Sequence, residues 1–189
     1  MEKIVKVDTG LDNSLTVKRV RALLKCIPQS SKGWGFQIFK GLRLIRADGV
    51  RFTLSIQGSE GHYCVPKRCL SDLSQYEGVE IGIIPDERNE SSPYRFGHIL
   101  DPKEIDFREV KEGDIEPYGE KQLRGWLQPK DVGFKRMQEH QVRDEVLGYF
   151  PVRDLVADLA EFFDAGGVID ASHEDTQKWV GKIIAAVQS

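Results

Sequence analysis

The sequence predicts an α+β protein in which an N-terminal antiparallel β-meander with a packed amphipathic helix is followed by a C-terminal helical segment. Three patterns lead to this fold class. Apolar residues recur at helical spacing before residue 28, alternate with polar residues between residues 35 and 57, and return to helical spacing after residue 150. The apolar face of such a meander must be shielded from water, and an amphipathic helix packed against it provides that shielding.

The first elements are expected to be a short strand at residues 4–8 and a helix over about residues 14–27. Residues 12–14, Asp-Asn-Ser, supply side chains suited to an N-cap. The apolar face of the helix has the spacing i, i+3, i+4, i+7 and consists of Val20, Leu23, Leu24 and Ile27. The opposite face carries Lys18, Arg21 and Lys25. The predicted helix is therefore amphipathic, with a basic solvent-facing side.

Two registers compete at the turn after the strand-like run of residues 35–46. A two-residue turn at residues 48–49 would place Arg43 opposite Leu54. A three-residue loop at residues 47–49, with Gly49 left-handed, instead places Leu42 opposite Leu54. We prefer the second register because it collects one face that is apolar except for Lys40: Phe36, Ile38, Leu42, Leu44, Phe52, Leu54 and Ile56. The other face then carries Gln37, Phe39, Arg43, Ile45, Arg51, Thr53 and Ser55.

Residues 58–61, Gly-Ser-Glu-Gly, are expected to form the loop of a second hairpin. The resulting register places Tyr63 and Val65 on the apolar face and His62 and Cys64 on the polar face. This predicts three consecutive strands that form one antiparallel meander.

The remaining N-terminal elements are a short helical turn at residues 71–76 and a strand at residues 79–84. Beyond them the composition changes, because eight acidic residues stand against three basic ones between residues 101 and 120. The chain is therefore divided into a basic α+β unit (1–100), an acidic connector (101–130) and a helical segment (131–189).

The C-terminal segment is expected to hold up to three helices. The first spans about residues 135–147, and the second begins at Pro151 and ends before residue 166. The apolar face of the second consists of Val152, Leu155, Val156, Leu159 and Phe163, and its outer face of Asp154, Asp158 and Glu161. Ser172 and Asp175 resemble a capping box before a last helix, whose inner face is Trp179, Val180, Ile183, Ile184 and Val187.

The charge is divided unevenly along the 189-residue chain. In total 27 basic residues face 30 acidic ones, a net charge of −3, which excludes a uniformly basic nucleic-acid-binding protein. Residues 1–70 carry 13 − 5 = +8, and the remainder carries 14 − 25 = −11. Three cysteines, an odd number, and no long apolar run predict a cytoplasmic protein without a membrane partner.

The best candidate for a functional surface is a basic region interleaved with aromatic residues. Residues 14–51 contain nine Lys or Arg and one acid, Asp48. Nucleic-acid-binding proteins use cations for phosphates and flat side chains for bases. The candidate residues are Lys18, Arg21, Lys25, Lys32, Trp34, Phe39, Arg43, Arg46 and Arg51. The alternative is that the C-terminal helices cover this sheet face, which would make Phe39 a core residue and Arg43 an ion-pair partner.

The sequence therefore predicts a non-catalytic binding or regulatory protein that engages an anionic partner, either a nucleic acid or an acidic protein. An alternative is a protein-binding adaptor or inhibitor that acts through its acidic C-terminal helices and an exposed loop. The candidate protein-binding residues in that loop are Tyr94, Arg95, Phe96 and His98. A small metal-dependent hydrolase or nuclease ranks lowest, because no catalytic motif is present.

No cofactor and no metal site are predicted. His62, Cys64 and Cys69 offer three potential zinc ligands within eight positions. The Cys-x-x-Cys spacing of zinc knuckles is missing, however, and free, half-buried cysteines are the favoured interpretation.

Overall fold

The computed structural model describes residues 13–33, 35–86, 127–140, 146–172, 176, 177, 179 and 181. Its elements are α1 (Asn13–Cys26), β1 (Gln29–Gly33), β2 (Phe36–Phe39), β3 (Leu42–Ile45), β4 (Arg51–Gln57), the 3-10 helix η1 (Leu73–Gln75), β5 (Gly78–Pro85), α2 (Pro129–Val132), α3 (Lys135–Glu139), β6 (Leu147–Pro151), α4 (Val152–Asp164) and β7 (Val168–Ile169). The α+β class is confirmed.

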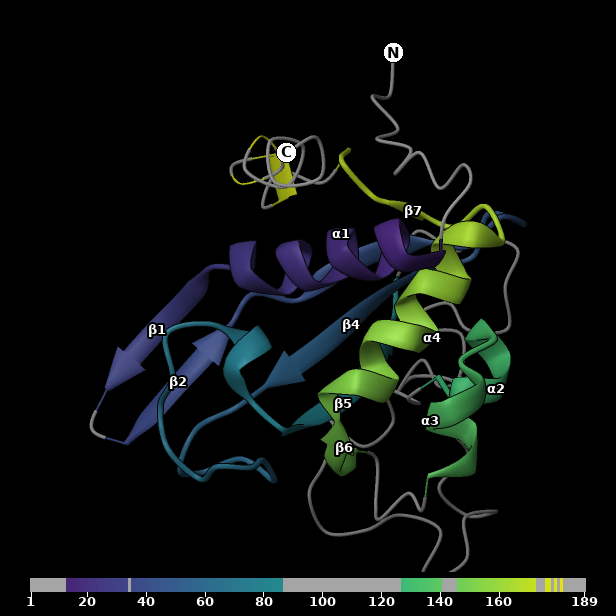
Figure 1. Ribbon diagram of the computed structural model, residues 1–189. Helices are drawn as coiled ribbons and strands as arrows, with labels where there is room; N and C mark the ends of the chain where they lie inside the picture. The colour runs from purple at the N-terminus through teal and green to yellow at the C-terminus, as the bar shows by residue number, and fades with distance from the viewer. Residues whose placement is uncertain are drawn as a thin grey trace, which may run out of the picture.

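The strands form a five-stranded sheet and a separate hairpin (Figure 1). The order of the sheet is β6-β5-β4-β3-β7, and every neighbouring pair is antiparallel. β1 and β2 pair with each other and extend away from the sheet. Strands from the C-terminal part of the chain thus occupy both outer positions of the described sheet.

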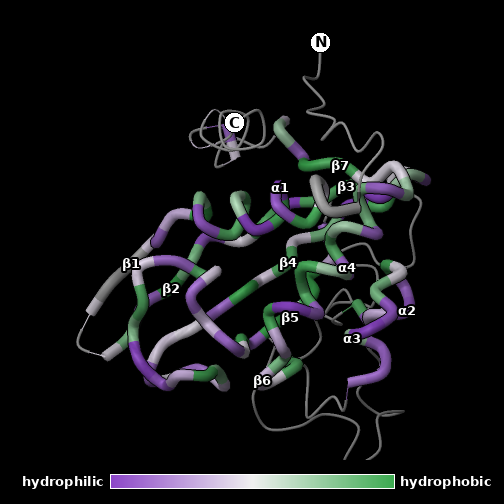
Figure 2. Tube along the Cα trace, viewed as in Figure 1, coloured by the Kyte–Doolittle hydropathy of each residue, from purple (hydrophilic) through white to green (hydrophobic). Residues whose placement is uncertain are grey.

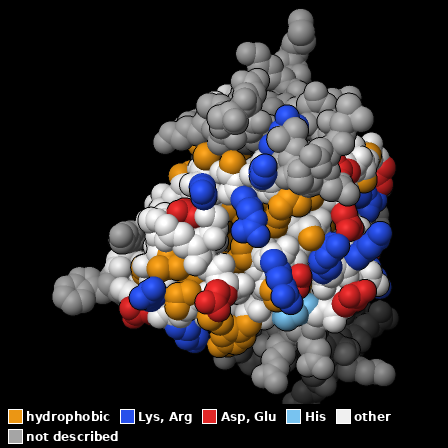
Figure 3. All heavy atoms as spheres, viewed as in Figure 1, with side chains coloured by type: hydrophobic (Ala, Val, Ile, Leu, Met, Phe, Trp, Pro, Cys, Tyr) orange, Lys and Arg blue, Asp and Glu red, His pale blue; other side chains and the backbone are white. Residues whose placement is uncertain are grey.

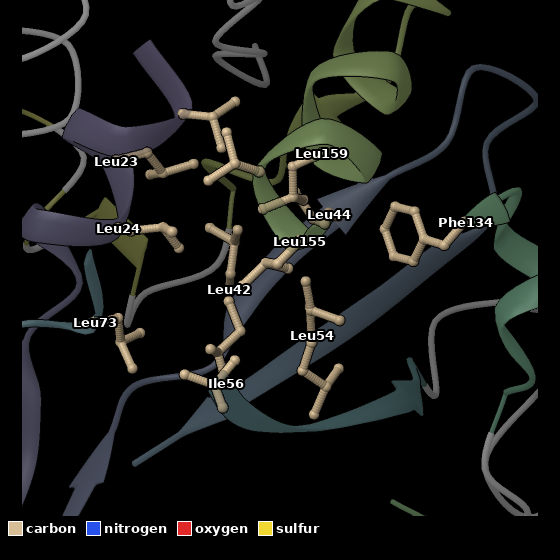
Figure 4. Packing of buried hydrophobic residues seen from close by; sticks show 14 of the residues in the cluster. Leu23, Leu24, Leu42, Leu44, Leu54, Ile56, Leu73, Phe134, Leu155 and Leu159 are labelled. Atoms are coloured by element: carbon tan, nitrogen blue, oxygen red, sulfur yellow. The ribbon is translucent and has the colours of Figure 1, made fainter. Parts of the chain in front are cut away.

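The hydrophobic core lies between the sheet and the two longest helices, α1 and α4 (Figures 1 and 4). Hydrophobic and hydrophilic positions alternate along α1 (Figure 2), and all four residues of its predicted apolar face are buried. Figure 4 shows Leu23 and Leu24 of α1 and Leu155 and Leu159 of α4 converging on Leu42, Leu44, Leu54 and Ile56 of the sheet. Burying one such leucine contributes about 1.5–3 kcal/mol.

The predicted three-residue turn between β3 and β4 is confirmed. Leu42 pairs with Leu54 and Leu44 with Phe52, and the backbone amide of Arg46 donates to the carbonyl of Val50 at 2.8 Å. Gly49 adopts a φ of 93°, which a side chain would disfavour.

The predicted continuous strand over residues 35–46 is wrong, because it breaks at Lys40 and Gly41. Phe39 and Leu42 are three positions apart, yet both point into the core, so the alternation reverses across the break. Phe36 and Ile38 are consequently exposed, and not part of the apolar face. The physical reason is that β2 pairs with β1 instead of continuing the pairing with β4.

A glutamine side chain connects β2 to β4 in place of regular strand pairing. The amide nitrogen of Phe39 donates to Oε1 of Gln57 at 2.9 Å, and Nε2 of Gln57 donates to the carbonyl of Phe39 at 3.0 Å. Both residues are buried. These two hydrogen bonds reproduce one rung of a β-ladder and fix the base of the β1–β2 hairpin.

The predicted second hairpin at residues 58–61 is also wrong, since β4 pairs with the distant β5. Residues 58–77 form a long connection that includes η1. Within it His62 and Cys64 are buried and Tyr63 and Val65 are exposed, the reverse of the prediction.

A buried tyrosine organises this long connection. The hydroxyl oxygen of Tyr76 lies 2.8 Å from the carbonyls of Gly58 and Arg68 and accepts from the amide of Leu70 at 2.9 Å. Nε2 of Gln37 donates to the same hydroxyl at 2.9 Å. These long-range contacts outweigh the local preference for a tight hairpin.

The C-terminal part differs from the prediction in three places. In the described part of the expected helix over residues 135–147, residues 135–139 form α3 and Leu147 begins β6, with α2 before them, and the strands β6 and β7 were not predicted. The helix beginning after Pro151 is confirmed as α4, and its predicted apolar face is buried. Near the end of the chain Trp179 is buried, as predicted for an inner face, whereas Asp175 of the expected capping box lies outside the described residues.

The predicted strand at residues 4–8 and residues 101–126 of the predicted connector (101–130) also lie outside the described residues, whereas Pro129 at the end of the connector begins α2. No helix in the described part of the chain has both the length and the apolar character needed to cross a membrane.

Candidate functional site

The exposed side of α1 carries the basic residues that the sequence predicts. Lys18, Arg21 and Lys25 are all exposed, and α1 contains no acidic residue. Their spacing of three and four positions places them in one stripe, about 10 Å long at 1.5 Å per residue. Figure 3 shows basic side chains over the part of the molecule where α1 lies. We call these three residues the α1 stripe.

The arginines of the sheet are engaged by buried acids. Nη1 of Arg43 lies 3.4 Å from Oδ2 of Asp86, and Nη1 of Arg51 lies 3.0 Å from Oδ2 of Asp170. The two side chains are only 28% and 21% exposed. The expected ion pair of Arg43 is therefore present, but its partner comes from the end of β5 and not from the C-terminal helices.

Arg46 is likewise paired, with Asp48 of the β3–β4 turn and with the backbone carbonyl of Asp131. The hydrogen bond from Arg46 lowers the pKa of the Asp48 carboxyl. Three of the predicted anion-binding residues thus use their charge within the molecule.

Of the two aromatic residues named from the sequence, the one that the structure describes does not lie on an open surface. The structure corrects the position of Phe39, which is 1% exposed and belongs to the core because the alternation of buried and exposed positions reverses at the break between β2 and β3. Trp34 and the side chain of Lys32 lie outside the described part of the structure.

Three other aromatic residues are exposed, and the sequence did not predict their exposure. Phe36 is 43%, Tyr63 52% and Tyr149 47% exposed. The rings of Tyr63 and Tyr149 contact each other, with their centroids 5.8 Å apart. The only local signal is the basic pair Lys67-Arg68, which follows Tyr63 closely in the sequence.

One cation lies beside this aromatic pair, and a second follows it in the chain. Nζ of Lys67 is 5.7 Å from the centroid of the Tyr63 ring, and the next residue, Arg68, is exposed. Neither forms an ion pair with another described residue. Figure 3 shows hydrophobic, basic and acidic side chains together along the lower edge, on the same face as α1.

The contact between Ser59 and His62 has a structural role. Oγ of Ser59 lies 2.7 Å from Nδ1 of His62, both residues are buried, and the imidazole stacks on Phe36 at 5.0 Å. Burial lowers the pKa of His62, although the nearby Glu80 opposes this shift. A buried serine offers its oxygen to no external substrate, so the contact fixes the loop.

Cys64 is buried as well, and burial raises the pKa of its thiol. A thiol in this state is a poor nucleophile and a poor metal ligand. Within the described residues no group of three or more His, Cys, Asp or Glu side chains is arranged to hold a metal ion.

The predicted acidic outer face of α4 needs correction, because Asp158 is buried. Its carboxylate accepts from the backbone amides of Arg136 and Met137 at the start of α3. Glu161 pairs with Arg136 at 2.9 Å, and Asp154 pairs with a neighbouring arginine of the same helix. The helix α3 packs on α4 and engages two of these acids, Asp158 and Glu161.

The candidate protein-binding residues Tyr94, Arg95, Phe96 and His98 lie outside the described residues, so they stay a prediction. No protein-family model, no curated protein and no solved structure matches this chain.

Proposed function

We propose that this protein is a non-catalytic binding protein that engages the phosphate backbone of a nucleic acid through the α1 stripe. The observation that carries the proposal is a contrast between two groups of cations. Arg43, Arg46 and Arg51 are engaged by Asp86, Asp48 and Asp170. The three residues of the α1 stripe are exposed and form no ion pair among the described residues.

The dimensions of the stripe suit a polyanion. Successive phosphates of one strand of B-form DNA advance by about 3.4 Å along the axis, so a stripe about 10 Å long spans about three of them. The apolar side of α1 is anchored by Leu23 and Leu24 in the core, so the helix presents its cations from a rigid base. Such contacts are electrostatic and independent of base sequence.

The proposal is tested by measuring the affinity of the full chain for fluorescein-labelled oligonucleotides by fluorescence anisotropy over a range of salt concentrations. The variant Lys18→Ala/Arg21→Ala/Lys25→Ala removes three cations, and alanine favours the helical state. Loss of three phosphate contacts should reduce the slope of log K against log salt by about 2 to 3.

A matched control removes the same charge elsewhere. Lys130, Lys135 and Arg153 are exposed on α2, α3 and α4, so Lys130→Ala/Lys135→Ala/Arg153→Ala lowers the net charge equally. For this control we expect the slope of log K against log salt to differ from that of the wild type by less than about 1, the effect of losing one phosphate contact. If the slope fell equally in both variants, the effect would be one of net charge alone, and the assignment of the contacts to α1 would be overturned. Binding of an acidic protein in place of any oligonucleotide would overturn the nucleic-acid form of the proposal.

A further inference from the structure

The two most exposed large hydrophobic side chains in the described structure, Tyr63 and Tyr149, contact each other. They come from segments more than eighty positions apart, the loop after β4 and the outer strand β6. Their rings are tilted by 60° at a centroid separation of 5.8 Å. Neither hydroxyl group forms a hydrogen bond with another described residue.

The backbone holds this pair rigidly although its rings face solvent. The amide of Tyr149 donates to the carbonyl of Tyr63 at 2.7 Å, and the amide of Tyr63 donates to Oε2 of Glu80 at 3.0 Å. Gly148 permits the close approach, because a Cβ atom there would lie 2.8 Å from Cβ of Tyr63. The pair is therefore ordered by its surroundings and not by contact between the rings alone.

Tyr149 adopts a left-handed backbone conformation, with a φ of 56°, and is the single non-glycine residue with positive φ in the described ranges. Such conformations are unfavourable for aromatic residues, and they concentrate at functional sites. Here the conformation brings an exposed ring beside a second exposed ring. A purely structural role would bury the ring, which is the usual way in which an aromatic residue stabilises a fold.

A cation contacts the aromatic pair. Nζ of Lys67 lies over the ring of Tyr63, and the exposed Arg68 follows it in the chain. The carboxylate of Glu80 accepts from the amide of Tyr63, and Glu77 is an exposed acid whose backbone amide donates to Val65. Exposed aromatic rings with adjacent cations are the combination that binds unpaired bases and their phosphates.

We infer that the Tyr63–Tyr149 pair stacks the bases of single-stranded nucleic acid, while Lys67 and Arg68 contact its phosphates. The inference rests on the proposed function and adds that the nucleic acid is single-stranded. In a duplex the faces of the bases are covered by their neighbours, so two exposed rings gain stacking energy only from unpaired bases. The connection that carries Tyr63 also contains η1, which packs beside α1.

The inference is tested by comparing the binding of a fluorescein-labelled oligothymidylate with that of its duplex with oligoadenylate. Tyr63→Leu and Tyr149→Leu remove a ring but keep an apolar side chain of similar size. Each should weaken single-strand binding by about 5- to 150-fold, the effect of losing one stacked base, and leave duplex binding within about twofold. Tyr63→Phe and Tyr149→Phe keep the rings and should bind as the wild type does.

A second readout locates the contact directly. Oligonucleotides that carry 5-iodouracil crosslink to adjacent aromatic residues on irradiation, and we expect the crosslinked peptides to contain Tyr63 or Tyr149. Wild-type affinity in both leucine variants, or crosslinks confined to other residues, would overturn the inference. The inference would also be overturned if no oligonucleotide bound and an apolar protein partner bound the leucine variants as well as the wild type.

The two proposals fail in different ways. If duplex and single strand both depend on the α1 stripe and neither leucine variant changes affinity, the proposed function stands and the stacking site is overturned. If the leucine variants lose single-strand binding while the Lys18→Ala/Arg21→Ala/Lys25→Ala variant keeps it, the stacking site stands and the role of α1 is overturned.

Discussion

The carboxylate of Asp158, in the middle of α4, accepts a hydrogen bond from the backbone amide of Met137, 2.9 Å away in α3. Its other oxygen accepts from the amide of Arg136 and from the guanidinium of the same residue, both at 3.1 Å. Asp158 therefore caps the start of a helix from outside that helix. A five-residue helix is too short to be stable alone, so this contact keeps α3 folded.

Replacing this carboxylate should destabilise the protein. Asp158→Ala removes a cap and leaves a buried amide without a partner, and we expect a loss of about 2–4 kcal/mol in the free energy of unfolding. Urea denaturation measures this loss. The control Asp154→Ala alters a partly exposed acid on the same helix and should change stability by less than about 0.5 kcal/mol. Equal effects of the two variants would contradict the capping role.

The side chain of Gln57 offers a second test of the fold. Gln57→Met keeps the volume but leaves the amide and carbonyl groups of Phe39 unpaired inside the protein, which should cost about 2–4 kcal/mol. Hydrogen exchange should also quicken at the amide of Phe39. Gln75→Met, at an exposed glutamine of η1, is the matched control and should leave both measurements unchanged. Persistent protection of Phe39 in Gln57→Met would disprove the bridge.

The stability of the protein should fall in mild acid because of His62. Burial lowers the pKa of its imidazole from the usual value of about 6.5, so the unfolded chain binds a proton that the folded chain resists. The free energy of unfolding should therefore decrease as the pH falls from about 6.5 toward the lowered pKa, and this contribution should be constant above about 6.5. Urea denaturation at several pH values of the wild type and of His62→Gln measures it. The difference between the two proteins should shrink in acid, and parallel curves would contradict the prediction.

Tyr149 should prove dispensable for stability, in contrast to its buried neighbour. The left-handed conformation costs about 1–2 kcal/mol for a residue such as tyrosine, and asparagine adopts it more readily. Tyr149→Asn should therefore leave the free energy of unfolding within about 1 kcal/mol of the wild type or raise it. Phe150→Ala, which empties a core position, should lower it by about 3–5 kcal/mol. Thermal denaturation of the two variants checks this, and similar losses would show that Tyr149 serves the fold.

Elements whose pattern is complete within a short stretch were predictable. The turn between β3 and β4 follows from Gly49 together with the pairing of Leu42 and Leu54, because a shift by one residue would expose every apolar side chain. α1 and α4 follow from apolar spacing alone. The same spacing places Lys18 and Arg21 on the exposed side of α1, so this part of the candidate site could also be predicted.

Features that depend on distant segments could not be predicted in this way. Arg51 and Asp170 are 119 positions apart, and nothing local marks their ion pair. Between β2 and β3 the alternation of buried and exposed positions reverses. This reversal depends on Gln57, whose side-chain amide makes the hydrogen bonds to Phe39 that a neighbouring strand would otherwise make. The Tyr63–Tyr149 pair requires the unpredicted strand β6, so no sequence pattern identifies this half of the candidate site.

The order of strands in the sheet has a consequence for synthesis of the protein. β3, β4 and β5 leave the ribosome first, whereas β6 and β7, which flank them in the folded sheet, follow much later. The interval from Pro85 to Leu147 is 147 − 85 = 62 residues, about 3–12 s of translation at roughly 5–20 residues per second. During that time the three nascent strands present two edges that can pair with other chains. Nascent chains of this protein are thus expected to rely on chaperones until β6 and β7 arrive, and chains truncated before β6 are expected to aggregate.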